Sequence, residues 1–264
     1  MNAVLDGLAS NPALPSSLLS RVVVLADGVL ALTLARRSDL SGAHVQALLA
    51  LGDADVVAAL LEEGWVHPSA VPVLDVWTAL VVAEHPDAPP DLVRSLAVHP
   101  DPVVRIRLAR LGCLPADVAR ILARDPDSRV AAALFSRVEQ PSVRAEPDLT
   151  VVEIRSLVAS EGSAAYVRAA RSPQCPPDLL HLMASRTEEG EVLRAVARNP
   201  HTSGETLLLC LGDAQARHLA AAHPRLPVPM IVKMLGSEFT AGPAASNPSL
   251  PVEVMEELLL GVES

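Results

Sequence analysis

Hydrophobic residues recur along the chain in a register that proline and short polar residues punctuate. An apolar residue, which we call the anchor, opens each of ten copies, with spacings of 26, 27, 21, 26, 26, 35, 27, 24 and 24 residues. The anchors are Leu8, Leu34, Leu61, Val82, Leu108, Leu134, Ala169, Val196, Ala220 and Ala244. Self-similarity at such a period is typical of repeat proteins, so the pattern predicts about ten repeats of 21–35 residues.

Small and polar residues hold fixed places after each anchor. The next residue is alanine in eight copies, from Ala9 to Ala245, which indicates close helix packing. A short polar residue often stands three places after the anchor, followed directly by proline, and this pair suits a turn. These polar residues are Asn11, His85, Ser172, Asn199, His223 and Asn247.

A second proline column predicts where helices begin. The residue seven places after the anchor is proline in eight copies and serine in two, Ser41 and Ser203. Because the missing N–H of proline costs nothing at the first helical residue, we expect proline to occupy that residue. Apolar residues then follow on one face, as in Leu179, Leu180 and Met183. A polar break and a second helix lead to the next anchor, so each repeat is predicted to be a helix pair.

No helix pair of this length can bury its own apolar face, so neighbouring pairs must stack. We therefore expect an all-α protein in which residues 1–264 form a single helical-repeat domain with a continuous core. The third and sixth repeats are irregular in length, and Asp75 and Asp148 fall there on positions that are apolar in the other copies.

The repeat motif resembles a known family. Segments such as Leu8-Ala-Ser-Asn-Pro-Ala-Leu-Pro and Val196-Ala-Arg-Asn-Pro-His-Thr-Ser are similar to the variant leucine-rich repeat. The resemblance covers nearly all of the chain. It implies a right-handed α-solenoid of alternating α and 3-10-like helices, close to HEAT and armadillo arrays, and it implies no chemistry.

Composition makes the few aromatic residues conspicuous. Hydrophobic residues make up 50% of the chain and aromatic residues only 2%, so the core is predicted to be aliphatic. Trp65 and Trp77 flank the irregular third repeat, and Tyr166 lies close to the sixth. Each ring either fills a gap in the stack or presents a contact surface to a partner.

Motifs for catalysis and metal binding are missing from the sequence. Cys113, Cys175 and Cys210 lack ligand spacing, and Cys210 falls on a buried stripe. His85 and His223 occupy equivalent turns, where capping is the favoured interpretation. The sequence contains no HExxH, GxSxG or glycine-rich phosphate loop. We expect no enzymatic activity, no cofactor and no metal.

The net charge of −10 disfavours general affinity for nucleic acid. Residues 1–6 contain no basic segment, and the longest apolar stretch is interrupted at Asp27 and Gly28, so we expect a cytoplasmic protein with no membrane partner. Arginine is concentrated in residues 89–232, which contain seventeen arginines and sixteen acidic residues.

Two groups of arginine recur in the repeats. The first stands two residues after the anchor, and the second lies on the second helix of each repeat. The first group is Arg36, Arg110, Arg171 and Arg198. The second group is Arg105, Arg129, Arg168, Arg194 and Arg217. They either offset helix dipoles and pair with acidic turns, or line a groove for an acidic peptide or a phosphate backbone.

Three hypotheses about function follow. The leading one is a non-enzymatic scaffold that binds a protein partner, of unknown identity, on one face, with the arginines and Trp65, Trp77 and Tyr166 as candidate contacts. The alternative is a nucleic-acid-binding repeat protein with an arginine-lined concave face, similar to helical-repeat DNA glycosylases. The third is a structural subunit of a larger complex.

Overall fold

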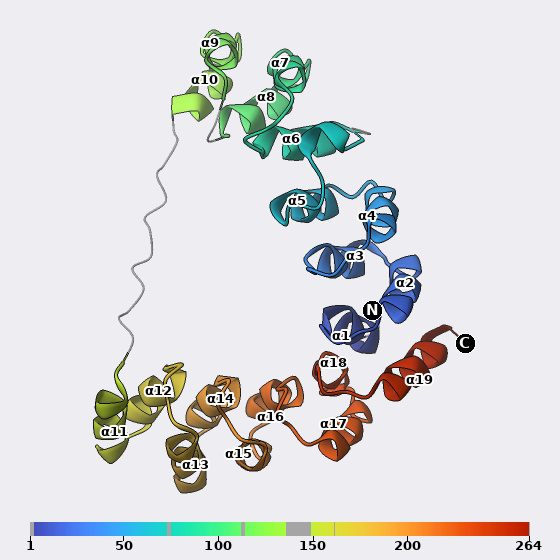
Figure 1. Cartoon of the computed structure of the whole chain (residues 1–264). Coiled ribbons are helices and arrows are strands. Elements are labelled where there is room, and N and C mark those ends of the chain that lie inside the picture. The colour runs from blue at the N-terminus through green and yellow to red at the C-terminus, as the bar shows by residue number, and fades with distance from the viewer. Residues whose placement is uncertain (1–2, 73–74, 112–113, 136–148, 161, 264) are drawn as a thin grey trace. The chain divides into compact units, whose positions relative to one another are not determined.

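The computed structural model describes residues 3–72, 75–111, 114–135, 149–160 and 162–263 (Figure 1). Within these ranges the chain is all-helical, with nineteen α-helices, one 3-10 helix and no strand. The chain forms two compact units, unit 1 from Met1–Val22 with Arg144–Ser264 and unit 2 from Val23–Val143. The all-α prediction is confirmed. The expectation of a single domain over residues 1–264 stays a prediction.

Unit 1 contains two rows of helices. In the first row each helix packs on the next, and the second row holds the alternate helices of the chain (Figure 1). The first row is α12 (Ser163–Arg171), α14 (Gly190–Arg198), α16 (Ala214–Ala221), α18 (Ala241–Ala245) and α1 (Ala3–Ser10). The second row is α11 (Val151–Ala159), α13 (Pro177–Arg186), α15 (Gly204–Cys210), α17 (Val228–Leu235) and α19 (Val252–Glu263).

Unit 2 alternates its helices in the same way, with α3 packed on α5, α6 on α8 and α8 on α10. Its helices are α3 (Gly28–Ala35), α4 (Gly42–Leu49), α5 (Ala54–Glu62), the 3-10 helix η1 (Pro68–Ala70), α6 (Val76–Glu84), α7 (Pro90–Ala97), α8 (Pro102–Ala109), α9 (Ala116–Leu122) and α10 (Ser128–Phe135). The remaining helix, α2 (Ser16–Val24), contains the sequence boundary between the units.

Burial follows the predicted columns. Nine of the ten anchors are buried, and the tenth, Leu134, is partly buried against the same core. The alanine that follows the anchor is at most 3% exposed in all eight copies that carry it. Leucine, valine and alanine dominate the buried set, as the scarcity of rings predicted.

Most helices that follow the second proline column begin one residue later than expected. Pro89, Pro115, Pro176 and Pro227 are N-cap residues with extended ψ, so the prediction that proline is the first helical residue is wrong by one position there. At Pro68, the first residue of the 3-10 helix η1, the prediction is confirmed. The N-cap needs no N–H of its own, and its carbonyl accepts the first helical bond, as Pro176 does from the Leu180 N–H at 3.2 Å. Serine suits the same place because its hydroxyl caps the helix.

Asp75 is exposed and not in the core. Its carboxylate accepts the backbone N–H groups of Trp77 and Thr78 at 2.7 and 2.9 Å and so caps α6. The bond from the Thr78 N–H is the main cause that lowers the pKa of Asp75. The assignment of Asp75 to an apolar core position is therefore wrong, and Asp148 lies outside the described residues.

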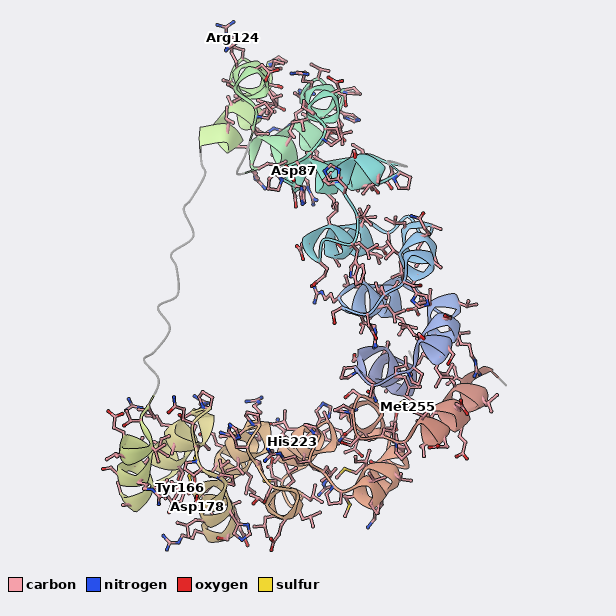
Figure 2. All side chains as sticks on the ribbon, viewed as in Figure 1. Asp87, Arg124, Tyr166, Asp178, His223 and Met255 are labelled. Atoms are coloured by element: carbon pink, nitrogen blue, oxygen red, sulfur yellow. The ribbon has the colours of Figure 1, made fainter. Side chains whose placement is uncertain are left out.

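A ladder of buried polar side chains links successive repeats of unit 1. Asn199 donates from Nδ2 to the carbonyls of Ala170 and Ser172 at 2.7 and 2.9 Å. In the next repeat His223 donates from Nε2 to the Asn199 carbonyl at 3.1 Å (Figure 2). Asn247 then donates to the carbonyls of Ala221 and His223, both at 2.8 Å. Each buried side chain is thus satisfied by the backbone of the preceding repeat.

The first repeat of the sequence continues the ladder after the last one. Asn11 donates from Nδ2 to the carbonyls of Ala245 and Asn247 at 2.9 and 2.7 Å. Helix α1 accordingly packs on α18. A Cβ atom on Gly7 would collide with the Gly242 carbonyl oxygen and would lie 2.8 Å from the Ala245 Cβ, so this contact requires glycine. The two ends of the sequence are therefore neighbours in the packing of unit 1.

Candidate functional site

Two candidate arginines form ion pairs with aspartates in turns of unit 2. Arg105 donates two hydrogen bonds to Asp125, at 2.7 and 3.0 Å, and both side chains are largely buried. Arg129 lies 2.7 Å from Asp127, and this hydrogen bond is the main cause that lowers the pKa of Asp127 to about 2. Arg105 and Arg129 are thus engaged within the fold.

Other candidate arginines occupy helix C-termini or surface turns. Arg36 and Arg110 are the exposed C-cap residues of α3 and α8, where a cation is favoured by the helix dipole. Arg217 donates from Nε to the Leu211 carbonyl at 2.8 Å, and Arg168 is exposed on α12. None of these four side chains lines the pocket of unit 1 that contains three other candidate arginines.

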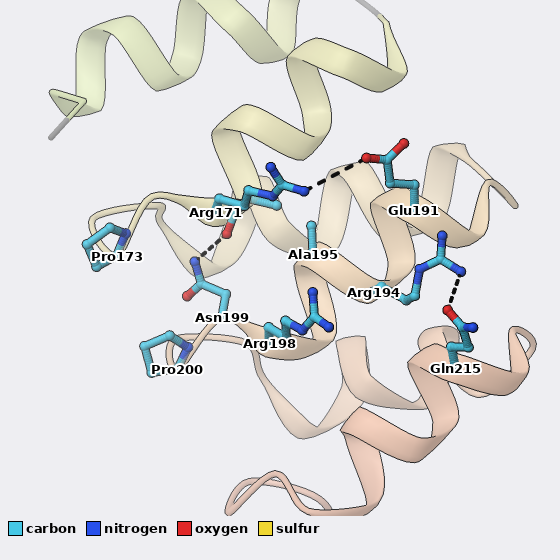
Figure 3. A pocket seen from close by; sticks show the side chains of 10 residues that line it. Arg171, Pro173, Glu191, Arg194, Ala195, Arg198, Asn199, Pro200 and Gln215 are labelled. Atoms are coloured by element: carbon cyan, nitrogen blue, oxygen red, sulfur yellow. Dashed lines mark hydrogen bonds and ion pairs between the residues drawn. The ribbon is translucent and has the colours of Figure 1, made fainter. Parts of the chain in front are cut away.

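Three candidate arginines line one pocket of unit 1. Arg171 comes from α12, and Arg194 and Arg198 come from α14, where a spacing of four residues places them on one helix face (Figure 3). The pocket measures about 460 Å³ and also contains Glu191 and Gln215. Arg171 and Arg198 belong to the first predicted group and Arg194 to the second, so the fold joins members of both groups.

The guanidinium groups in this pocket are only loosely engaged. The Arg171 Nη2 lies 3.9 Å from the Glu191 carboxylate, with both side chains more than 60% exposed, and Arg194 donates to the Gln215 Oε1 at 2.8 Å. Within the described ranges Arg198 has neither a hydrogen bond nor an ion pair. Three arginines against one glutamate leave two positive charges, so the pocket suits an anionic group. We call these five residues the arginine pocket.

The candidate aromatic residues occupy three different environments. Trp65 is half-buried and donates from Nε1 to the Arg37 carbonyl at 2.9 Å. This bond reaches the backbone of the preceding repeat, as the asparagine and histidine bonds of the ladder do in unit 1. Tyr166 is 7% exposed, so its ring contributes to packing (Figure 2). Trp77 is 46% exposed, and the Arg107 guanidinium lies 4.9 Å from the centroid of its ring. Of the three, Trp77 offers the largest surface to a partner.

Histidine and cysteine act structurally where the structure describes them. The Nδ1 atoms of His85 and His223 both accept the backbone N–H two residues later, at 3.1 Å, which confirms turn capping. Burial raises the pKa of the Cys175 thiol to about 11 and that of the Cys210 thiol to about 12. Cys113 lies outside the described residues. No three His, Cys, Asp or Glu side chains in the described ranges gather into a set that could hold a metal ion.

Sequence reasoning missed Glu191 and Gln215, which complete the arginine pocket from neighbouring repeats. Their sequence signal is weak, since both are single exposed polar residues near the start of a helix. Among the described residues no helix is both long and apolar enough to cross a membrane. Comparison of the chain with protein-family models, with curated proteins and with solved structures finds no match.

Proposed function

We propose that this chain is a right-handed α-solenoid of about ten variant leucine-rich repeats that binds a protein partner and has no catalytic role. We further propose that the arginine pocket of unit 1 receives an acidic segment of that partner. The single observation that carries the proposal is the gathering of Arg171, Arg194 and Arg198 around one pocket.

The chemistry of the pocket supports a carboxylate ligand. Guanidinium groups bind carboxylates in a bidentate geometry, and Arg198 is available to do so without breaking a bond to another described residue. Glu191 competes for Arg171 only at 3.9 Å. An incoming carboxylate therefore replaces a weak exposed interaction, which costs little.

The distribution of the remaining arginines favours a protein segment over nucleic acid. A nucleic acid needs many phosphate contacts along an extended basic surface. Arg94, Arg105 and Arg129 instead pair with aspartates at 2.7 to 2.8 Å. A pocket of about 460 Å³ matches a few side chains better than a polynucleotide backbone.

The test is fluorescence anisotropy with the full chain and three labelled probes: octaglutamate, octalysine and a single-stranded twelve-nucleotide oligo(dT). We expect octaglutamate binding to weaken as salt rises and to lose about fivefold in affinity in Arg198→Ala, while octalysine binding does not fall in that variant. Arg36→Ala is the matched control and should bind octaglutamate like the wild type. Tighter binding of oligo(dT) than of octaglutamate would replace this proposal with the nucleic-acid alternative, and no binding of octaglutamate would refute it.

A further inference from the structure

The arginine pocket is one end of a longer face on unit 1. A second pocket, of about 430 Å³, lies between α16, α18 and α1. Helix α16 contributes Gln215 to the first pocket and His218, Leu219 and Ala222 to the second. These positions are three, four and seven residues after Gln215, so they lie on one stripe of the helix. Both pockets therefore open on the same face.

The second pocket carries the opposite charge. Asp6 of α1 is its only lysine, arginine, aspartate or glutamate, and the Asp6 side chain has no hydrogen bond or ion pair within the described ranges. The Ser10 hydroxyl donates to the Asp6 backbone carbonyl at 3.0 Å and does not engage the carboxylate. Asp6 is thus available to a cation, as Arg198 is to an anion.

The second pocket is lined largely by small residues. Ala3 and Ala222 add little bulk to it, whereas Gly7 and Gly242 serve the close contact between α1 and α18. Phe239 stands beside this pocket, 56% exposed, with its ring 5.6 Å from the His218 ring in an edge-on contact. This face combines an anion site, a floor of small side chains and a cation site.

We infer that this face binds an extended peptide segment with two charged residues of opposite sign, an acidic one in the arginine pocket and a basic one on Asp6. The inference rests on the proposed function of the arginine pocket. From α14 to α1 there are three helix-to-helix steps of roughly 8–10 Å each, and the last is shortened by the glycine contact. A span of roughly 25 Å corresponds to about seven or eight residues of extended chain.

The experiment uses a series of labelled peptides with a Glu-Glu pair, a spacer of alternating serine and threonine, and a terminal lysine or glutamine, made in both chain directions. The lysine peptide should bind about two- to fivefold more tightly than its glutamine counterpart, with the largest ratio at a separation of about seven or eight residues. The ratio should fall to one in Asp6→Asn, stay high in Asp6→Glu, and stay at the wild-type value in the control Glu253→Gln.

Failure of this inference and failure of the proposed function give different results. If the Glu-Glu peptides bind through Arg198 but lysine adds nothing at any spacing, the inference is overturned and the arginine pocket stands. A lysine effect that survives in Asp6→Asn overturns it equally. If the glutamine-terminated peptides do not bind at all, the proposed function fails and this inference fails with it.

Discussion

Asparagine at the turn position performs two tasks that together explain its pairing with proline. In Asn199, Oδ1 accepts the His201 N–H at 2.9 Å while Nδ2 donates to two carbonyls of the preceding repeat. No polar atom of the buried amide is left unsatisfied, which avoids a cost of about 1–3 kcal/mol. Histidine performs both tasks with its two ring nitrogens but reaches one carbonyl instead of two.

His223 should make the stability of unit 1 depend on pH. Because Nδ1 accepts the Arg225 N–H, the neutral ring carries its proton on Nε2, and burial lowers the pKa of His223 below its ordinary value near 6.5. The folded state therefore binds fewer protons than the unfolded state. The contribution of the neutral, buried His223 ring to the free energy of unfolding is complete above about pH 6.5. It is lost as the pH falls through the lowered pKa of His223.

His223→Asn should remove this dependence and keep the fold, because asparagine fills the same position in Asn199 and Asn247. Urea unfolding at a series of pH values between 4 and 8 measures the effect. His223→Ala is the comparison, and it should destabilise at neutral pH by roughly 1–3 kcal/mol through the lost hydrogen bonds. If His223→Asn unfolds like His223→Ala at pH 8, the two residues are not equivalent in the ladder.

Cys175 and Cys210 should be unreactive in the folded protein. Their thiols are 1% and 0% exposed, and pKa values of about 11 and about 12 leave almost no thiolate at neutral pH. In a Cys113→Ser variant, Ellman's reagent should detect no thiol until denaturant is added, and then two. Rapid labelling under native conditions would show that these positions open readily.

At the scale of elements, the sequence predicted which segments are helical but not where each begins. The anchor and alanine columns are core positions because they face the neighbouring repeat, and a period in hydrophobicity reveals such positions. The helix boundary is less visible, because proline fits both the N-cap and the first helical residue. The prediction for Asp75 was wrong for a related reason. In the irregular third repeat, the residue that caps α6 falls on a position that is apolar in the other repeats.

The packing of α1 on α18 could not be read from the order of repeats, because adjacency in sequence gives no hint that the first repeat follows the last. Gly7→Ala should destabilise unit 1 by roughly 1–3 kcal/mol, since the added Cβ meets the Gly242 carbonyl. Gly212→Ala is the matched control, because a Cβ there has no atom within 4 Å, and its effect should stay within about 0.5 kcal/mol.

Thermal unfolding monitored by circular dichroism compares the two glycine variants with the wild type. Equal midpoints for Gly7→Ala and Gly212→Ala would mean that α1 does not pack tightly on α18. In that case Asn11 would not complete the ladder either, because the same contact places its amide against Ala245 and Asn247.

At the scale of the whole molecule, the sequence identified the arginines of the candidate site but not their grouping. Arg194 and Arg198 share a helix, so their spacing of four residues already implied a common face. Arg171 reaches the same pocket only because α12 packs on α14, which is information about tertiary structure. Conversely, Arg105 and Arg129 belong to the same predicted group as Arg194, yet they form ion pairs with Asp125 and Asp127.

The central claim is that the arginine pocket of unit 1 binds an acidic segment, and charge reversal in that pocket tests it most directly. Isothermal titration of octaglutamate and octalysine into the wild type and Arg198→Glu gives four affinities. We predict that Arg198→Glu weakens octaglutamate binding about tenfold or more and strengthens octalysine binding. Unchanged affinities for both peptides in Arg198→Glu would contradict the account.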